Sequence, residues 1–83
     1  MNFSETEINN WGKMLTMEGH LGEAIEVLKL NVSLNPNSTD ALGSLGQAYE
    51  KNGLKESAVS CYKKLLEKAP DNEFAKGRLA KLE

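Results

Sequence analysis

Apolar residues recur along most of the chain at steps of three and four positions, which is the spacing of an amphipathic helix. In the first such segment, for example, this spacing places Ile8, Trp11 and Leu15 on one side. The pattern predicts five helices, near residues 5–18, 22–34, 39–52, 55–68 and 73–82, and no strand. The sequence therefore predicts an all-α fold.

Residues that favour helix starts stand where these segments begin. Ser4 is followed three positions later by Glu7, which is the spacing of a capping box. The third and fifth segments each begin shortly after a proline, with Ser38 or Thr39 and with Asp71 or Asn72 as the candidate caps. Local sequence thus predicts where three of the five helices begin.

The chain repeats itself with a period of 34 residues. Pro36 and Pro70 are 34 positions apart, and so are Gly19 and Gly53. Because proline cannot continue a helix, Pro36 and Pro70 close the two blocks, while Gly19 and Gly53 are expected to end the first helix within each block. The same offset relates Gly12 to Gly46, Ala24 to Ala58, Ala41 to Ala75, Gly43 to Gly77 and Leu45 to Leu79.

A helix–turn–helix unit of this length resembles the tetratricopeptide repeat. The residues that carry the resemblance in the second block are Leu42, Leu45, Gly46, Tyr49, Ala58, Tyr62 and Pro70, and in the first block Ile8, Trp11, Gly12, Leu15, Ala24, Leu28 and Pro36. The resemblance implies one α-solenoid domain over residues 1–83. It divides into a repeat at about 5–38, a second at about 39–72 and a C-terminal capping helix at about 73–82.

Small residues inside the helices raise a question, because a helical glycine costs about 1 kcal/mol relative to alanine. By the resemblance, Gly12 and Gly46 are structural residues of the first helices and Ala24 and Ala58 of the second, and we expect Gly46 to meet Ala58 where the helices cross. Gly43 and Gly77 fall on the concave face. There they either open a groove or relieve crowding against the neighbouring repeat, and the sequence favours neither.

Residues 24–72 also resemble, more weakly, the repeat pair at the C-terminal end of bacterial serine hydrolases related to β-lactamases. Lys29, Leu30, Asn31 and Val32 carry this likeness, which implies an appended module without the catalytic half. Asn31 stands where the general repeat has a small apolar residue. We expect its amide to bond backbone near the start of the following helix, because a buried unpaired amide is costly.

Composition narrows the function classes. The 83 residues carry ten Lys and Arg against twelve Asp and Glu, with the cations dispersed, which speaks against nucleic acid as a partner. Cys61 is the only cysteine, so neither an internal disulfide nor a cysteine-based metal site is expected. No apolar run reaches the length of a membrane span, and the first ten residues lack the features of a signal peptide. We expect a soluble chain, with the cytoplasm favoured.

Nothing in the sequence indicates catalysis, a metal or a cofactor. His20, the only histidine, lies in a predicted turn without an evident partner. Cys61 is expected to be a half-buried small apolar residue, and the glutamates, Glu50 among them, are expected on solvated outward faces. Gly43 and Gly46 lie within a helix and form no phosphate loop. The sequence therefore predicts a protein that is not an enzyme.

Two functions remain. The first is a protein or peptide module whose concave face, by the resemblance, uses Asn9, Lys13, Ser44, Gln47, Lys51 and Arg78 to hold an acidic or C-terminal peptide. The Lys and Asn clamp by which some family members hold chaperone tails is not reproduced, since Ser44 replaces an Asn and Phe74 a Lys. The second is a structural module that joins domains or subunits, as a homodimer for instance, through an apolar edge at Phe3, Ile8 and Trp11.

Overall fold

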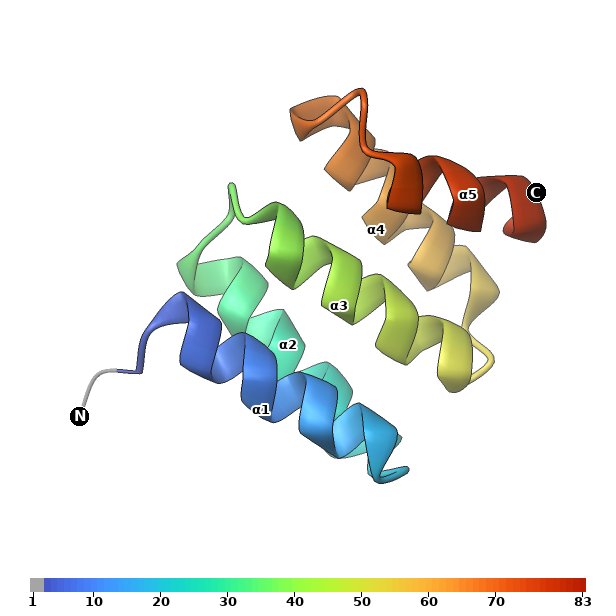
Figure 1. Ribbon diagram of the computed structural model, residues 1–83. Coiled ribbons are helices and arrows are strands. Elements are labelled where there is room, and N and C mark those ends of the chain that lie inside the picture. Colours follow the sequence, from blue (N-terminus) through green and yellow to red (C-terminus); the bar gives the residue numbers. More distant parts are fainter. Residues whose placement is uncertain (1–2) are drawn as a thin grey trace.

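The computed structural model describes residues 3–83, and these form five helices and no strand. The helices are α1 (Glu5–Met17), α2 (Leu21–Leu34), α3 (Thr39–Lys51), α4 (Lys55–Lys68) and α5 (Glu73–Leu82) (Figure 1). The predicted all-α fold is confirmed, and each predicted helix end lies within one residue of the observed end.

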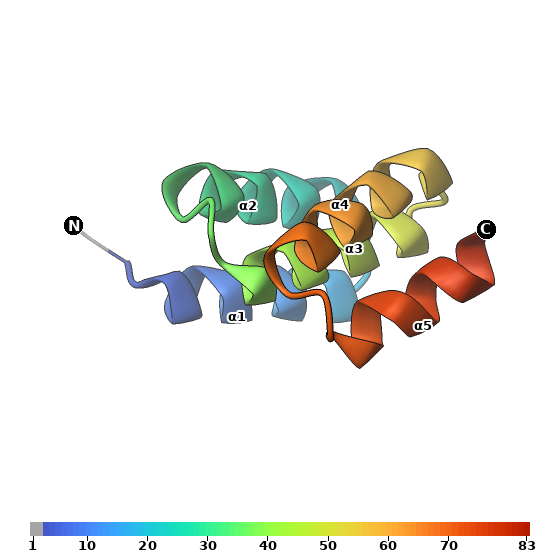
Figure 2. The same cartoon turned by 90° about the horizontal axis from the view of Figure 1, so that it is seen from above.

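The helices stack as two antiparallel pairs, α1 with α2 and α3 with α4, and α5 then packs on α4. Seen from above, α1, α3 and α5 lie along one side of the stack, while α2 and α4 lie along the other (Figure 2). The first helices of the repeats therefore share one surface. This is the arrangement of an α-solenoid, in which each repeat contacts its neighbours in the chain.

The predicted helix starts are confirmed. The Ser4 hydroxyl accepts a hydrogen bond from the Glu7 amide at 3.1 Å, and the Glu7 carboxylate accepts one from the Ser4 amide at 2.9 Å. These bonds hold the pKa of Glu7 below its ordinary value. Ser38 and Asn72 cap α3 and α5 in the same way, by accepting from the amides of Ala41 and Ala75.

The two turns within the repeats depend on glycine. Gly19 and Gly53 have φ angles of 87° and 75°, which lie in the left-handed region that other residues adopt only with strain. Pro36 and Pro70 lie just beyond the ends of α2 and α4. The ends of the first four helices thus each have a local cause in the sequence.

Large side chains explain the glycines of the first helices. A Cβ atom on Gly12 would lie 2.4 Å from the Leu28 side chain, and one on Gly46 would lie 2.7 Å from the Tyr62 ring. Both distances are shorter than any van der Waals contact, so α1 and α3 can approach α2 and α4 only where Cβ is absent. The nearest neighbour of Gly46 on α4 is the Tyr62 ring, one turn after Ala58, which was the partner expected from the resemblance.

Asn31 also has a different partner from the one expected. It is fully buried, and its amide nitrogen donates to the Glu5 carbonyl at 3.2 Å, at the start of the preceding helix α1. Its amide oxygen accepts from the Asn35 side chain at 2.9 Å. The expectation of a bond to the following helix was wrong because antiparallel packing brings the last turn of α2 beside the first turn of α1.

Candidate functional site

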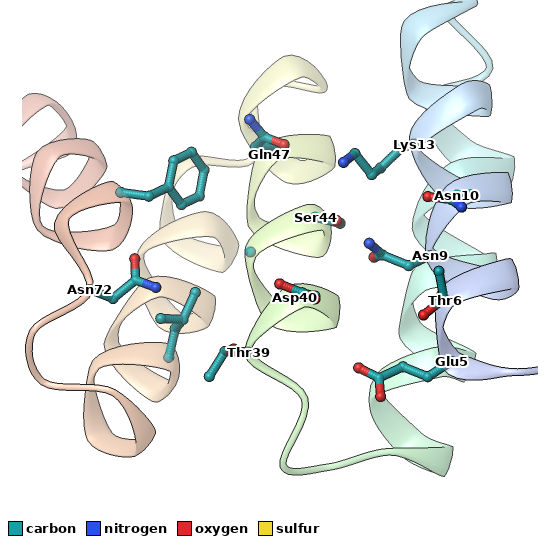
Figure 3. A pocket seen from close by; sticks show the side chains of 13 residues that line it. Glu5, Thr6, Asn9, Asn10, Lys13, Thr39, Asp40, Ser44, Gln47 and Asn72 are labelled. Carbon is teal, nitrogen blue, oxygen red and sulfur yellow. The ribbon is translucent and has the colours of Figure 1, made fainter.

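A groove of about 400 Å³ runs along the surface formed by the first helices of the repeats (Figure 3). α1 contributes Glu5, Thr6, Asn9, Asn10 and Lys13 to it, and α3 contributes Thr39, Asp40, Gly43, Ser44 and Gln47. Leu65, Asn72 and Phe74 complete the lining. Most of these side chains are polar, so the groove offers hydrogen bonds more than apolar contact.

Four of the six predicted peptide-binding residues line this groove, namely Asn9, Lys13, Ser44 and Gln47. Asn9 and Ser44 face each other across the space between α1 and α3 (Figure 3). Lys13 and Gln47 lie together toward one end, and Glu5 lies at the other (Figure 3). The repeat therefore brings residues that are more than 30 positions apart onto one surface.

Arg78 and Lys51 do not line the groove. The Arg78 guanidinium is paired with Glu50: its Nε donates to one carboxylate oxygen at 2.9 Å and its Nη2 donates to the other. The expectation that Glu50 lies on a solvated face was wrong, since its side chain is only 14% exposed. Arg78 is thus paired with a carboxylate of the protein through two of its nitrogens, while Lys51 is exposed at the end of α3.

Glu50 joins three helices, because it also accepts a hydrogen bond from the Tyr62 hydroxyl of α4 at 2.7 Å. The hydrogen bond from Arg78 is the main cause that holds the pKa of Glu50 below its ordinary value. Burial, reinforced by the bond to Glu50, raises the pKa of Tyr62. Glu50, Tyr62 and Arg78 form a structural cluster that the sequence reasoning missed.

The period of the chain contains a signal for this cluster. The residues 34 positions before Glu50, Tyr62 and Arg78 are Thr16, Leu28 and Ser44. At each of the three positions the later repeat therefore has a different residue from the earlier one. The three later residues, unlike the earlier three, include an acid and a base that can pair. Comparing the repeats position by position would therefore have indicated the contact.

Gly43 lies in the groove, and the structure supports the first of the two roles left open for it. A Cβ atom there would lie 3.5 Å from Leu65 and from the Phe74 ring, which is ordinary contact. Alanine would therefore fit at this position without crowding. The missing side chain instead leaves space between the polar wall at α1 and the apolar side chains of Leu65 and Phe74.

Asn9 has an incomplete set of hydrogen bonds. Its side chain is 8% exposed, and its Oδ1 is the only buried side-chain nitrogen or oxygen in residues 3–83 that lacks a hydrogen-bond partner. Buried amides normally satisfy their donors and acceptors. By contrast, the nearby Thr16 hydroxyl is satisfied, since it donates to the Gly12 carbonyl at 2.8 Å.

The charges along the groove are unevenly distributed. Glu5 and Asp40 place two carboxylates on its lining, and Lys13 supplies the one ammonium group among the lining side chains. The Ser38 hydroxyl donates to the Glu5 carboxylate and helps to fix it in place. The groove is therefore cationic only near Lys13 and Gln47.

Within residues 3–83 the structure shows no constellation typical of an active site. His20 is exposed at the start of α2, and burial raises the pKa of the Cys61 thiol to about 11, which disfavours the reactive thiolate. No group of three or more metal-ligating side chains is found in this part of the chain. Nor does any of its helices have the length and apolar character to cross a membrane.

Comparison with known proteins bears on the fold. A family model described as "Tetratricopeptide repeat" matches residues 15–82. Over 48 residues the chain is 44% identical to "Cellulose synthase operon protein C" of Escherichia coli (strain K12) and to "Putative cellulose synthase operon protein C" of Escherichia coli O157:H7. The match covers 58% of this chain and 4% of each relative. Neither relative is named as a serine hydrolase, so these matches lend no support to the weaker resemblance.

Proposed function

We propose that this chain, which belongs to the tetratricopeptide repeat family, is a non-catalytic module that holds an extended segment of a partner protein in the groove along α1, α3 and α5. Repeats of this family generally mediate protein–protein interactions. The observation that carries the proposal is that Asn9, Lys13, Ser44 and Gln47 converge on one polar groove. Residues 1–83 would then act as one module of two repeats and a capping helix.

The lining suits a peptide main chain. The amides of Asn9, Asn10 and Gln47 can both donate and accept, as the N–H and C=O groups of an extended segment require. Among them, the Oδ1 of Asn9 has an unmade hydrogen bond, which a donor on the segment satisfies once the amide turns toward it. The space beside Gly43 lets a side chain of the segment reach Leu65 and Phe74.

The charges favour a particular kind of segment. Lys13 can hold one carboxylate, and because the Lys13 side chain is exposed this ion pair contributes up to about 1 kcal/mol. Glu5 and Asp40 repel further acidic residues toward the other end of the groove. We therefore propose a segment with a single carboxylate, such as a C-terminus. A strongly acidic peptide would be favoured only if Lys13, Lys51 and Arg78 all lined the groove, and Lys13 alone does so.

This proposal predicts that Lys13→Glu weakens binding of such peptides about tenfold or more, because it replaces the cation of the groove by a like charge. The matched control is Lys51→Glu, which makes the same charge change outside the groove. The measurement is a fluorescence titration with peptides selected from a synthetic array with free C-termini. Amidation of the same peptides is expected to weaken binding to a similar extent.

The location of binding is checked by NMR with isotope-labelled protein. Shifts concentrated on Asn9, Lys13, Ser44 and Gln47 support the groove. Equal affinities of the Lys13→Glu and Lys51→Glu variants, or shifts confined to α2 and α4, would contradict it.

A further inference from the structure

The beginning of the stack carries an exposed apolar face. Trp11 and Met14 on α1 are each 48% exposed, Leu30 on α2 is 52% exposed, and Phe3 is 55% exposed. The predicted edge of Phe3, Ile8 and Trp11 needs a correction, because Ile8 is only 5% exposed and packs inside the repeat. We call Phe3, Trp11, Met14 and Leu30 the leading face.

The repeat shows what kind of surface the leading face is. The residues 34 positions after Trp11 and Met14 are Leu45 and Ala48, and both are buried in one cluster with Ile25 and Leu28 of α2. The side of α3 that carries Leu45 and Ala48 thus packs on the preceding helix α2, whereas the equivalent side of α1 is exposed. The leading face therefore has the position of a helix-packing surface in the stack, and no helix of residues 3–83 covers it.

The opposite end of the stack presents small residues. Ala80 on α5 is exposed, and it stands 34 positions after Gly46 and 68 after Gly12. In those two helices the equivalent position receives a large side chain, Tyr62 on Gly46 and Leu28 on Gly12. No such side chain of residues 3–83 covers Ala80, so this end can accept a bulky group from outside.

Charge also differs between the two ends. Residues 1–50 carry seven acidic side chains and two basic ones, whereas residues 51–83 carry eight basic and five acidic side chains. Glu7 lines a hollow with Phe3 and Trp11 at the leading face. Ser57 and Ser60 of α4 line the hollow between α2 and α4, on the side of α4 that faces the preceding repeat. Glu23 and Glu26 stand 34 positions earlier, on the equivalent side of α2, and therefore border the leading face. At the other end, Lys76 and Lys81 are exposed on α5, where the acidic residues are Glu73 and the C-cap Glu83, and Glu83 is paired with Lys63.

We infer that the leading face binds the α5 end of a second copy of this chain, head to tail. Large apolar side chains then meet the small surface at Ala80, and the acidic border meets Lys76 and Lys81. Pairing of two leading faces is disfavoured, since it would bring Glu7, Glu23 and Glu26 against their own counterparts. A head-to-tail contact uses different surfaces on the two copies, so it can continue into longer assemblies.

The test uses two variants of the chain in analytical ultracentrifugation. Trp11→Glu removes the leading face, and Ala80→Glu blocks the α5 end. Wild type is expected to gain mass with concentration and to lose mass when salt is raised, whereas each variant alone stays monomeric, with association about 30-fold weaker or more. An equimolar mixture is expected to form a dimer and nothing larger, because each variant keeps the surface that the other lacks.

Other results would overturn the inference. A dimer of Ala80→Glu alone would show that two leading faces meet, and a monomeric mixture would show that the α5 end is not the receptor. Wild type that stays monomeric at every concentration would show that the leading face does not bind a second copy. Far-UV circular dichroism checks that both variants fold. The double variant Lys76→Glu, Lys81→Glu is a second way to block the α5 end. Its association is expected to return when it is mixed with the double variant Glu23→Lys, Glu26→Lys, because the charges across the contact are then opposite again.

Discussion

Gly46→Leu is expected to lower the free energy of unfolding by about 3 kcal/mol or more, the largest effect that we expect from one substitution in this chain. Even the first atom of the new side chain would lie 2.7 Å from the Tyr62 ring. That ring cannot move aside easily, because Tyr62 is fully buried, packs edge to face against Phe74 with the ring centroids 5.7 Å apart, and bonds to Glu50. Thermal and urea unfolding measure the change.

The matched control is Gly43→Ala, one turn earlier in the same helix. There the new Cβ lies 3.5 Å from its nearest neighbours, so the helix gains up to about 1 kcal/mol from the replacement of glycine without overpacking. For a domain of this size, 1 kcal/mol changes the melting temperature by about 4–8 °C. If Gly46→Leu melted at or above wild type, close packing of α3 on α4 at this point would be refuted.

Glu50→Ala is expected to lower the free energy of unfolding by about 1–3 kcal/mol, because the hydroxyl of the fully buried Tyr62 loses its acceptor. Glu50→Gln separates the hydrogen bond from the charge, since an amide oxygen can still accept from Tyr62 but leaves Arg78 without a carboxylate. Urea unfolding of wild type and both variants at neutral pH gives the two contributions.

The charge of Glu50 also predicts how stability depends on pH. The pKa of this carboxyl is lowered in the folded protein from an ordinary value of 4.5, so the unfolded chain takes up the proton first. The contribution is therefore complete above pH 4.5 and is lost as the pH falls through the folded pKa. Wild type is expected to lose more stability on acidification than Glu50→Gln.

Both proteins retain Glu7, whose pKa is also lowered, so the difference between their pH curves isolates Glu50. Parallel curves from neutral pH to below pH 4.5 would show that the Arg78 pair does not stabilise the fold.

The helices were predictable because their signals are local. Ser4 and Glu7 form a capping box within one turn, and Gly19 and Gly53 end helices through their own backbone angles. The 34-residue period indicated that the helix pairs repeat, so equivalent residues of successive repeats were expected on the same side of the stack. The assignment of Asn9, Lys13, Ser44 and Gln47 to one surface came from the resemblance to the tetratricopeptide repeat, and all four line one groove.

The partners of individual side chains were not predictable in the same way. Asn31 bonds to α1 because of how α1 and α2 pack, and Arg78 bonds to Glu50 because of where α5 lies beside α3. A single helix indicates neither contact, and only the comparison of the repeats carries a signal for Arg78 and Glu50. Ile8 and Trp11 have the same apolar character, yet one is buried and the other exposed, because the side of α1 that faces α2 depends on the helix rotation. Such details require coordinates.

The place of α5 at the end of the stack has a consequence for native-state hydrogen exchange. This helix packs on α4, and beyond that contact the Arg78–Glu50 pair ties it to α3, so its amides are expected to exchange through local opening well before those of α2 and α3. Phe74, at its start, lines the groove. A segment that contacts Phe74 is therefore expected to slow exchange throughout α5, so deuterium uptake by α5 reports whether a bound segment reaches Phe74.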